Sequence, residues 1–185
     1  DVKTVVQCLG GAGNVIVNLH DMGAMVSVIT VLGDDSNAVL IADQLQQKGI
    51  ETTGILYSKS CQTLTKTRLR RGQQCLLRYD IGQKYSFDDA MLQQYLLAVK
   101  DALKSVDIIF VADYDKGSIP NELIQMLYQE QQLDPKIIVV DSKDYRKYSC
   151  LRPNLIKPNY EEARQILGQQ ENEDRTRQGM QWSKQ

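Results

Sequence analysis

The stretch Gly10-Gly11-Ala12-Gly13-Asn14 opens an apolar segment with helical spacing that ends at Gly23. Adjacent glycines allow the backbone to approach a ligand closely. The start of the following helix offers free N–H groups and the positive end of the helix dipole. Asn14 adds an amide that both donates and accepts hydrogen bonds. The stretch therefore suits a ligand that is rich in hydroxyl groups and that can carry a phosphate.

The glycine stretch alone is not specific. It does not match the dinucleotide-binding pattern G-x-G-x-x-G, because Ile16 stands where the third glycine would be. A glycine-rich turn between a strand and a helix, without any ligand, explains the stretch equally well. The functional interpretation therefore depends on later motifs, which are Gly33-Asp34-Asp35, Thr63-x-Thr65-Lys66 and Pro158-Asn159-x-x-Glu162.

Composition sets broad limits. A chain of 185 residues fits one domain with a sizeable core, and 42% apolar with 24% charged residues is ordinary for a soluble globular protein. The formal net charge of −1 gives no reason to expect nucleic acid or an acidic membrane as a partner. No apolar run reaches the roughly 18 residues of a membrane-spanning helix, and no secretory signal is visible. We therefore expect a cytoplasmic protein.

Cysteine and histidine usage argues against a zinc site. The four cysteines form no C-x-x-C pair, and His20 is the only histidine. We expect reduced thiols and a structural or surface histidine. The chain does not begin with Met, so we expect its natural N-terminus to lie upstream.

Strand and helix patterns alternate along the chain. This alternation predicts an α/β fold, with a parallel sheet covered by helices on both faces. Ligand sites in such folds lie at the carboxyl ends of the strands. The expected strands are residues 25–32, 50–57, 106–112, 136–140 and 155–157, and the expected helices after the first are residues 36–48, 88–104, 121–132 and 160–167.

One segment, about residues 62–80, breaks the alternation. It alternates polar and apolar residues around Gly72-Gln73-Gln74, which predicts a β-hairpin without a crossover helix. Such a hairpin should project from the sheet as a lid, and its apolar face would need a substrate or a second subunit as cover. We divide the chain into a domain at residues 1–168 and a polar segment of low order at residues 169–185.

Polar side chains follow three of the expected strands. Asp113 and Lys116 follow the third strand, Lys143 the fourth, and Asn159 with Glu162 the fifth. Carboxylate and amide oxygens three residues apart at a helix start could hold the water shell of Mg²⁺. Helix capping, above all by Asn159 and Asp113, or an ordinary surface pair is the structural alternative.

Two cations lie on the expected hairpin. Lys66 could bind a phosphate as a point charge, whereas Arg78 could donate to two phosphate oxygens at once. A solvated hairpin decorated with charges is the structural alternative.

Taken together, these motifs resemble the PfkB/ribokinase-like carbohydrate kinases, and within them the heptose-7-phosphate kinases of ADP-heptose synthesis. The resemblance runs to about residue 167. It implies a ribokinase-like three-layer α/β/α sandwich with a mostly parallel sheet and a small β lid, incomplete at both ends of the chain. The shared elements are Gly10-Gly11-Ala12-x-Asn14-Val15, Asn18, Gly23-Ala24, Gly33-x-Asp35, Thr65-Lys66-x-Arg68, Gln74-x-x-x-Arg78-x-Asp80, Asp113-Tyr114-x-Lys116-Gly117, Asp141-x-Lys143 and Pro158-Asn159-x-x-Glu162.

The resemblance implies transfer of the γ-phosphate of ATP to O1 of heptose 7-phosphate, a step in the synthesis of lipopolysaccharide core precursors. By the same resemblance, Gly10, Gly11 and Asn14 would hold sugar hydroxyls. Asp113 and Lys116 would border the sugar pocket.

The resemblance also assigns the remaining site residues. Lys66 and Arg78 would lie on the lid near the sugar phosphate. Lys143, Asn159 and Glu162 would face the ATP phosphates, and the last two would hold Mg²⁺ through water. The lid of such enzymes commonly pairs with a second subunit, which implies a homodimer.

The departures from the family concern catalysis. The family's Gly-Ala-Gly-Asp motif, which supplies the catalytic base and an anion hole, does not occur in this chain, nor do the family's first strand and its sugar-binding aspartate. Ser142 stands where heptose kinases often have proline. We expect no catalytic residue here and no kinase activity from the isolated chain. The alternatives are a non-catalytic module for sugar-phosphate binding or dimerisation, and a kinase for another sugar.

Overall fold

The computed structural model describes residues 1–168, and it confirms the alternation of strands and helices. The polar segment expected at residues 169–185 lies outside the described residues. The elements are α1 (Gly11–Asp21), β1 (Thr30–Gly33), α2 (Ser36–Gln46), β2 (Ile55–Ser58), β3 (Thr65–Arg71), β4 (Gln74–Ile81), α3 (Asp89–Ala102), β5 (Ile108–Asp113), α4 (Asn121–Leu133), β6 (Ile137–Ser142), the 3₁₀ helix η1 (Tyr145–Leu151), β7 (Leu155–Ile156) and α5 (Tyr160–Leu167).

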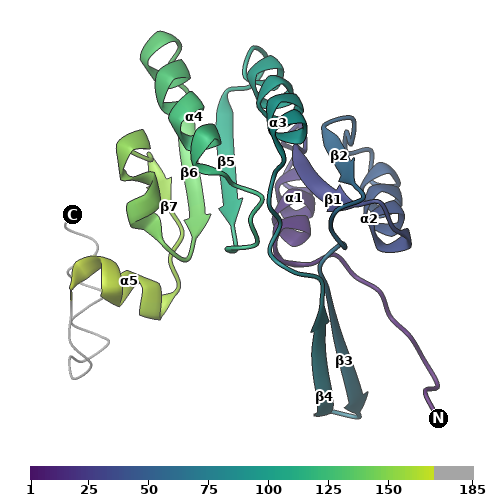
Figure 1. Ribbon diagram of the computed structural model, residues 1–185. Helices are drawn as coiled ribbons and strands as arrows, with labels where there is room; N and C mark the ends of the chain where they lie inside the picture. The colour runs from purple at the N-terminus through teal and green to yellow at the C-terminus, as the bar shows by residue number, and fades with distance from the viewer. Residues whose placement is uncertain (169–185) are drawn as a thin grey trace.

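The parallel strands form two separate sheets. β1 pairs with β2, and β6 pairs on one side with β5 and on the other with β7, always in parallel. Among the described residues, no hydrogen-bonded ladder joins β1 to β5. All these strands run in a similar direction, so their carboxyl ends lie on one side of the molecule (Figure 1).

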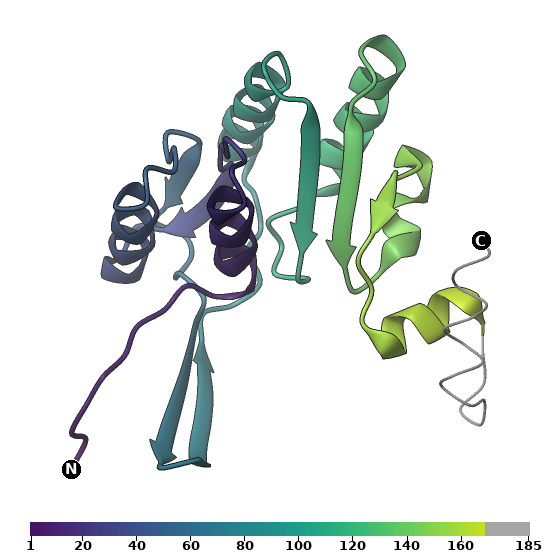
Figure 2. The same cartoon turned by 180° about the vertical axis from the view of Figure 1, so that it is seen from behind.

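The helices cover the larger sheet on one face. In Figure 1, α4 lies in front of β6 and α3 lies beside β5, toward β1, and Figure 2 shows the opposite face of β5 and β6 without a described helix over them. The main core accordingly packs Tyr95 and Leu127, on these helices, against Val111 and Ile138. Among the described residues this opposite face is open, and Ile108 on β5 is 54% exposed.

Side-chain caps fix where several helices begin. Asp35 accepts a hydrogen bond from the Ala38 N–H at the start of α2, and Asp88 accepts one from Met91 at the start of α3. These caps satisfy N–H groups that have no partner inside the helix. The first strand is shorter than residues 25–32, because before Thr30 the chain makes only an isolated bridge from Ser27 to Glu51. Within residues 1–168 no helix has both the length and the apolar character needed to span a bilayer.

Strands β3 and β4 form the predicted hairpin and project away from the rest of the molecule, on the side where the parallel strands end (Figure 1). The register pairs Leu69 with Leu77 and Thr67 with Tyr79, which gives the hairpin one apolar face. Lys66 and Arg68 alternate with these residues and so lie on the opposite face. A shift in register between Leu69 and Arg70 interrupts the pairing near the turn.

Candidate functional site

The start of α1 lies against the loop that follows β5. A Cβ atom added to Gly11 would come 3.1 Å from Cε2 of Tyr114, so the ring of this tyrosine packs closely on the glycine backbone. The Tyr114 hydroxyl donates to Oδ2 of Asp141 at 2.8 Å, and Lys157 pairs with the same oxygen at 3.1 Å. Tyr114 therefore joins the glycine stretch to the carboxyl end of β6.

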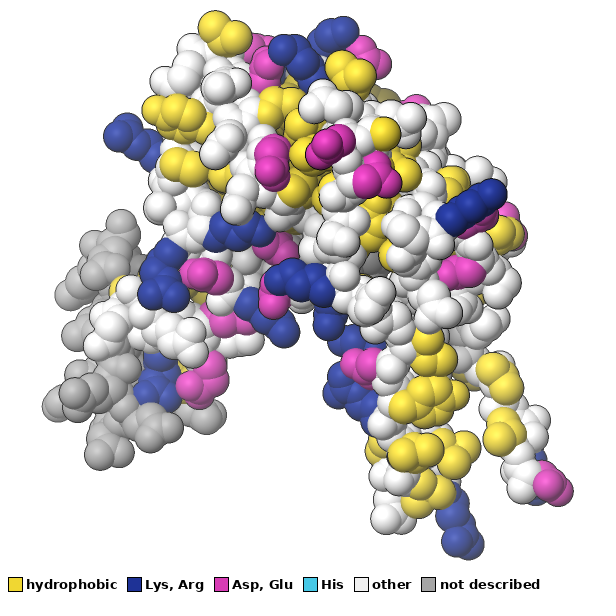
Figure 3. Space-filling view, in the orientation of Figure 1, with side chains coloured by type: hydrophobic (Ala, Val, Ile, Leu, Met, Phe, Trp, Pro, Cys, Tyr) yellow, Lys and Arg dark blue, Asp and Glu magenta, His cyan; other side chains and the backbone are white. Residues whose placement is uncertain are grey.

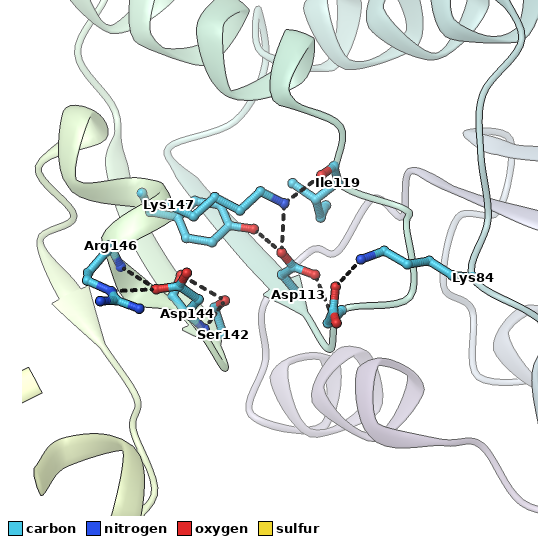
Figure 4. Close-up of polar contacts among 9 residues, drawn as sticks. Lys84, Asp113, Ile119, Ser142, Asp144, Arg146 and Lys147 are labelled. Carbon is cyan, nitrogen blue, oxygen red and sulfur yellow. Dashed lines mark hydrogen bonds and ion pairs between the residues drawn. The ribbon is translucent and has the colours of Figure 1, made fainter. Parts of the chain in front are cut away.

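Asp113, the last residue of β5, is buried, and both of its carboxylate oxygens have partners within the protein (Figure 4). Its Oδ1 accepts from the Asp115 N–H at 2.9 Å. Its Oδ2 accepts from Lys147 Nζ at 3.0 Å and from the Tyr148 hydroxyl. Lys147 also donates to the Ile119 carbonyl at 2.8 Å. The carboxylate thus orders the loop that carries Lys116, and its predicted place at the border of a sugar pocket stays a prediction.

Several tyrosines near this edge, among them Tyr114, Tyr148 and Tyr95, hold their protons more tightly than usual. Burial, together with the hydrogen bond to Asp141, raises the pKa of Tyr114 to about 12. Burial and the hydrogen bond to Asp113 raise the pKa of Tyr148, and burial raises that of Tyr95. Each shift arises because a tyrosinate would lose water or lie beside a carboxylate.

Stability should therefore fall in alkaline solution. An unfolded tyrosine ionises near pH 10, whereas folded Tyr148 keeps its proton above that pH, so its contribution is complete below pH 10 and is lost above it. We expect the free energy of unfolding to decrease by about 1.4 kcal/mol per pH unit for Tyr148 alone. Urea titrations between pH 9 and 11 measure this slope, and Tyr148→Phe should make it shallower. An identical slope in the variant would contradict the assignment.

The base of the hairpin is attached to the sheet at two points. Just before β3, the Thr63 N–H donates to Asp35 Oδ2 at 2.7 Å, and the Gly33 N–H donates to Thr63 Oγ1 at 3.0 Å. Burial acts to raise the pKa of Asp35, but its hydrogen bonds outweigh burial and the pKa is lowered. After β4, the Tyr85 N–H donates to the Lys116 carbonyl at 2.8 Å. The second attachment connects the hairpin to the loop after β5.

The basic face of the hairpin is directed toward this loop. Arg78 donates from Nε and Nη2 to the two oxygens of Asp80, each at 3.3 Å, and these hydrogen bonds chiefly lower the pKa of Asp80. Lys66 and Lys116 lie close enough to lower it further. In Figure 3, dark blue side chains line the side of the hairpin that faces the hollow beneath the sheet, and yellow ones cover the face toward the viewer. The structure therefore brings three of the predicted cations into one region.

The predicted nucleotide side consists of Lys143 and the start of α5. Lys143 is exposed and contributes to the lowered pKa of Asp115, whose main cause is the hydrogen bond from Lys84. Asn159 and Glu162 form a reciprocal capping box, in which each side chain accepts from the backbone N–H of the other at 2.9 and 2.8 Å. The capping alternative is thus observed, and Glu162 still lies near enough to Tyr114 to affect its pKa.

The donor set fits a metal ion held through water better than one held directly. Within residues 1–168 no group of three or more His, Cys, Asp or Glu side chains could hold a metal. Asn159 and Glu162 each use one side-chain oxygen in the capping box. Mg²⁺ usually keeps several of its waters, so these two residues fit an indirect role for that ion.

Sequence reasoning missed several residues that build this region. Tyr114 and Asp141 belong to the family motifs but were not predicted as site residues, and Lys147, Tyr148 and Lys157 were not singled out at all. One signal was available for Tyr148. Tyr145, Tyr148 and Leu151 have the i, i+3 spacing that puts side chains on one side of a 3₁₀ helix.

Known proteins similar to this chain are longer than it is. The chain is 34% identical over 169 residues to the bifunctional protein HldE of a Nitratiruptor species, and the match covers 91% of this chain but 35% of the relative. It is 33% identical to the bifunctional protein HldE of Helicobacter pylori, with 90% and 36% covered.

Solved structures agree on the fold. The structure titled Sa239 superposes with a TM-score of 0.69 at 19% identity, over 91% of this chain and 55% of that one. Fructokinase from Xylella fastidiosa with bound ATP superposes with a TM-score of 0.63 at 19% identity, over 89% and 55%. These neighbours support the ribokinase-like fold class, and the chain spans about half the length of each of them. The pattern of the pfkB family carbohydrate kinases matches residues 1–185, and the chain belongs to this family.

Proposed function

We propose that this chain is part of an ATP-dependent kinase that phosphorylates a sugar hydroxyl, with heptose 7-phosphate as the substrate and heptose 1,7-bisphosphate as the product. Membership of the carbohydrate kinase family supports the reaction class. The HldE relatives support the choice of a heptose, together with the motifs that resemble heptose kinases. Because the chain covers only about a third of the length of those relatives, we propose the kinase activity for the whole protein and not for this chain alone.

The observation that carries the proposal is the position of Tyr114. Its ring packs on Gly11, where the resemblance expects sugar hydroxyls, and its hydroxyl binds Asp141 beside the expected nucleotide side. Phosphoryl transfer depends mainly on holding donor and acceptor in line and on neutralising charge. A rigid side chain between the two expected binding regions serves that requirement.

The residues of this chain would bind and orient the sugar and the ATP phosphates. The exposed Asn14 amide would accept and donate hydrogen bonds with sugar hydroxyls, while Lys143 would neutralise phosphate charge. Mg²⁺, held through water near Asn159 and Glu162, would supply further charge neutralisation on the ATP phosphates. Since the chain has no Gly-Ala-Gly-Asp motif, we expect it to bind sugar phosphate without turning it over.

A ligand panel tests this function. We expect heptose 7-phosphate to raise the melting temperature of the 185-residue chain, whereas ribose, fructose 6-phosphate and adenosine leave it unchanged. A ligand at roughly 100 times its dissociation constant should add about 2.7 kcal/mol of stability. Asn14→Ala should abolish the shift, and Gln93→Ala, which removes an exposed amide from α3, should retain it.

Three outcomes, two from that panel and one from an activity assay, would overturn parts of the proposal. A shift with another sugar but not with heptose 7-phosphate would change the substrate. Formation of ADP from ATP and heptose 7-phosphate by this chain would refute the expectation that it lacks turnover. Absence of a shift with every sugar would count against sugar binding by this half and favour a module for dimerisation.

We further propose that the hairpin pairs two copies of the chain through its apolar face. Leu69, Leu77, Tyr79 and Ile81 are 41–54% exposed there. Exposed apolar clusters of this kind mark interaction surfaces. We expect light scattering to give a dimer for the natural chain and a monomer for Leu77→Asp. Gln73→Asp, at the hairpin turn, should remain dimeric, and a monomeric natural chain would refute the proposal.

A further inference from the structure

We propose that the N-terminal segment, residues 2–8, docks antiparallel on the free edge of β3 and forms a third strand of the hairpin. In this structure residues 1–8 belong to no helix or strand, and each of them is exposed. Val2, Val5 and Val6 are 65%, 78% and 82% exposed, although β-branched side chains favour a pleated, half-buried surface. The segment therefore has the composition of a strand but pairs with no strand among residues 1–168.

The hairpin offers the complementary edge. Among the described residues, β3 and β4 pair only with each other, so the backbone groups of β3 that point away from β4 are free to pair. An edge of this kind accepts a further strand through main-chain hydrogen bonds. A two-stranded hairpin alone is at best marginally stable in water, and a third strand that extends its apolar face stabilises it. Docking therefore stabilises the segment and the hairpin together.

The direction and the place of the segment suit this edge. In Figure 1 the hairpin and the segment leave the same side of the molecule, with the segment on the β3 side of the hairpin, and Figure 2 shows the same order from behind. β3 runs away from the body of the molecule, whereas the segment runs from its free end back toward the body. Neighbouring strands of opposite direction form an antiparallel ladder. Residues 2–8 also match the 7 residues of Thr65–Arg71 in length.

The segment and the hairpin are attached to the same loop. Leu9, directly after the segment, packs against a core cluster formed by α1, α2 and β2, and Gly11 lies against the ring of Tyr114. The loop that carries Tyr114 also binds the chain that follows β4, through the hydrogen bond from the Tyr85 N–H to the Lys116 carbonyl. The two bases are thus already held together, and the entropic cost of closing a loop is smaller when the loop is short.

The side-chain pattern selects the register. Alternate residues of a strand share a face, and end-to-end alignment with β3 puts the more apolar set of the segment on the apolar face of the hairpin. That set is Val2, Thr4, Val6 and Cys8. The neutral Gln7 and Val5 then lie opposite two cations of β3. Like charges meet in this alignment only where Lys3 lies opposite Arg70, near the turn. A shift by one residue would move Lys3 to the apolar face.

Docking would give the hairpin a third attachment to the body of the molecule. The attachments before β3 and after β4 have been described above. The docked strand would run directly into Gly10 and Gly11 at the start of α1. Movement of the hairpin would then be coupled to the glycine stretch.

Nuclear magnetic resonance of the 185-residue chain tests the docking. We expect nuclear Overhauser effects between the backbone protons of residues 4–8 and those of residues 65–69. Protection from amide exchange should be about tenfold higher for β3 amides that point away from β4 than for β4 amides that point away from β3. Equal protection at the two edges would overturn the proposal. Contacts that arise only between differently labelled copies would overturn pairing within one chain.

A cross-link tests the register. In Thr65→Cys the new thiol lies directly opposite Cys8, with Cβ atoms about 5 Å apart, which a disulfide bridges with little movement. We expect mild oxidation to join Cys8 to this thiol, as detected by mass spectrometry of peptides. In Lys66→Cys, the matched control, the new thiol lies on the opposite face of β3 and should not be joined to Cys8. Equal yields of the cross-link in both variants, or a cross-link in neither, would contradict the docked strand.

Discussion

Replacing Gly117 with alanine should destabilise the folded chain by roughly 3 kcal/mol or more. Its φ of +88° lies in the region that side chains rarely adopt, and an added Cβ would come within 2.0 Å of the Tyr85 carbonyl oxygen. The nearest atoms all belong to the Tyr85 backbone, so the backbone of one segment must move. The hydrogen bond from the Tyr85 N–H to the Lys116 carbonyl would be broken or lengthened as a result.

Gly72→Ala is the matched control for this prediction. Gly72 also has a positive φ, of +59°, but no atom lies within 4 Å of its added Cβ. Only the conformational cost should remain, which is about 1 kcal/mol. Urea denaturation of the two variants measures the difference. Equal losses of unfolding free energy in the two variants would show that the close contact with Tyr85 does not hold the hairpin base. A greater loss in Gly72→Ala than in Gly117→Ala would contradict the prediction.

Local signals made much of this fold predictable. The helix at residues 160–167 was predicted with its observed bounds, because Asn159 and Glu162 form a capping box at its start and Gly168 adopts the left-handed conformation at its end. The signal for the hairpin turn is equally local, since Gly72 separates two strands in which polar and apolar residues alternate. Such signals act over a few residues and do not depend on the rest of the chain.

The remaining features depend on contacts between distant residues. No pattern in residues 25–32 shows that the ladder begins only at Thr30, because that depends on where β2 lies. The separation of β1 from β5 likewise depends on which strands pair with each other, and not on the strand propensity of either segment. In the site, Asp113 is the last residue of β5 and does not follow the strand, and the side chains that bind its Oδ2 come 34 and 35 residues later, on η1.

The Asp113 contacts lead to the second large effect. Asp113→Ala should lower the free energy of unfolding by about 3 kcal/mol, because it leaves the partly buried Lys147 ammonium and the buried Tyr148 hydroxyl without their shared acceptor. Asp113→Asn keeps an acceptor and a similar shape, so its loss should be smaller. Urea denaturation at pH 7 measures both variants.

Asp115→Asn is the control, because it removes a carboxylate charge two residues away whose ion pair with Lys84 is exposed, and asparagine tolerates the positive φ of that position. Exposed pairs contribute about 0–1 kcal/mol, so this variant should be nearly as stable as the natural chain. A double-mutant cycle of Asp113→Ala with Lys147→Ala should show coupling, since the second change removes the uncompensated charge. If Asp113→Ala instead weakened sugar binding at unchanged stability, the carboxylate would be a ligand of the sugar, as the family resemblance implies, and not the residue that orders the loop.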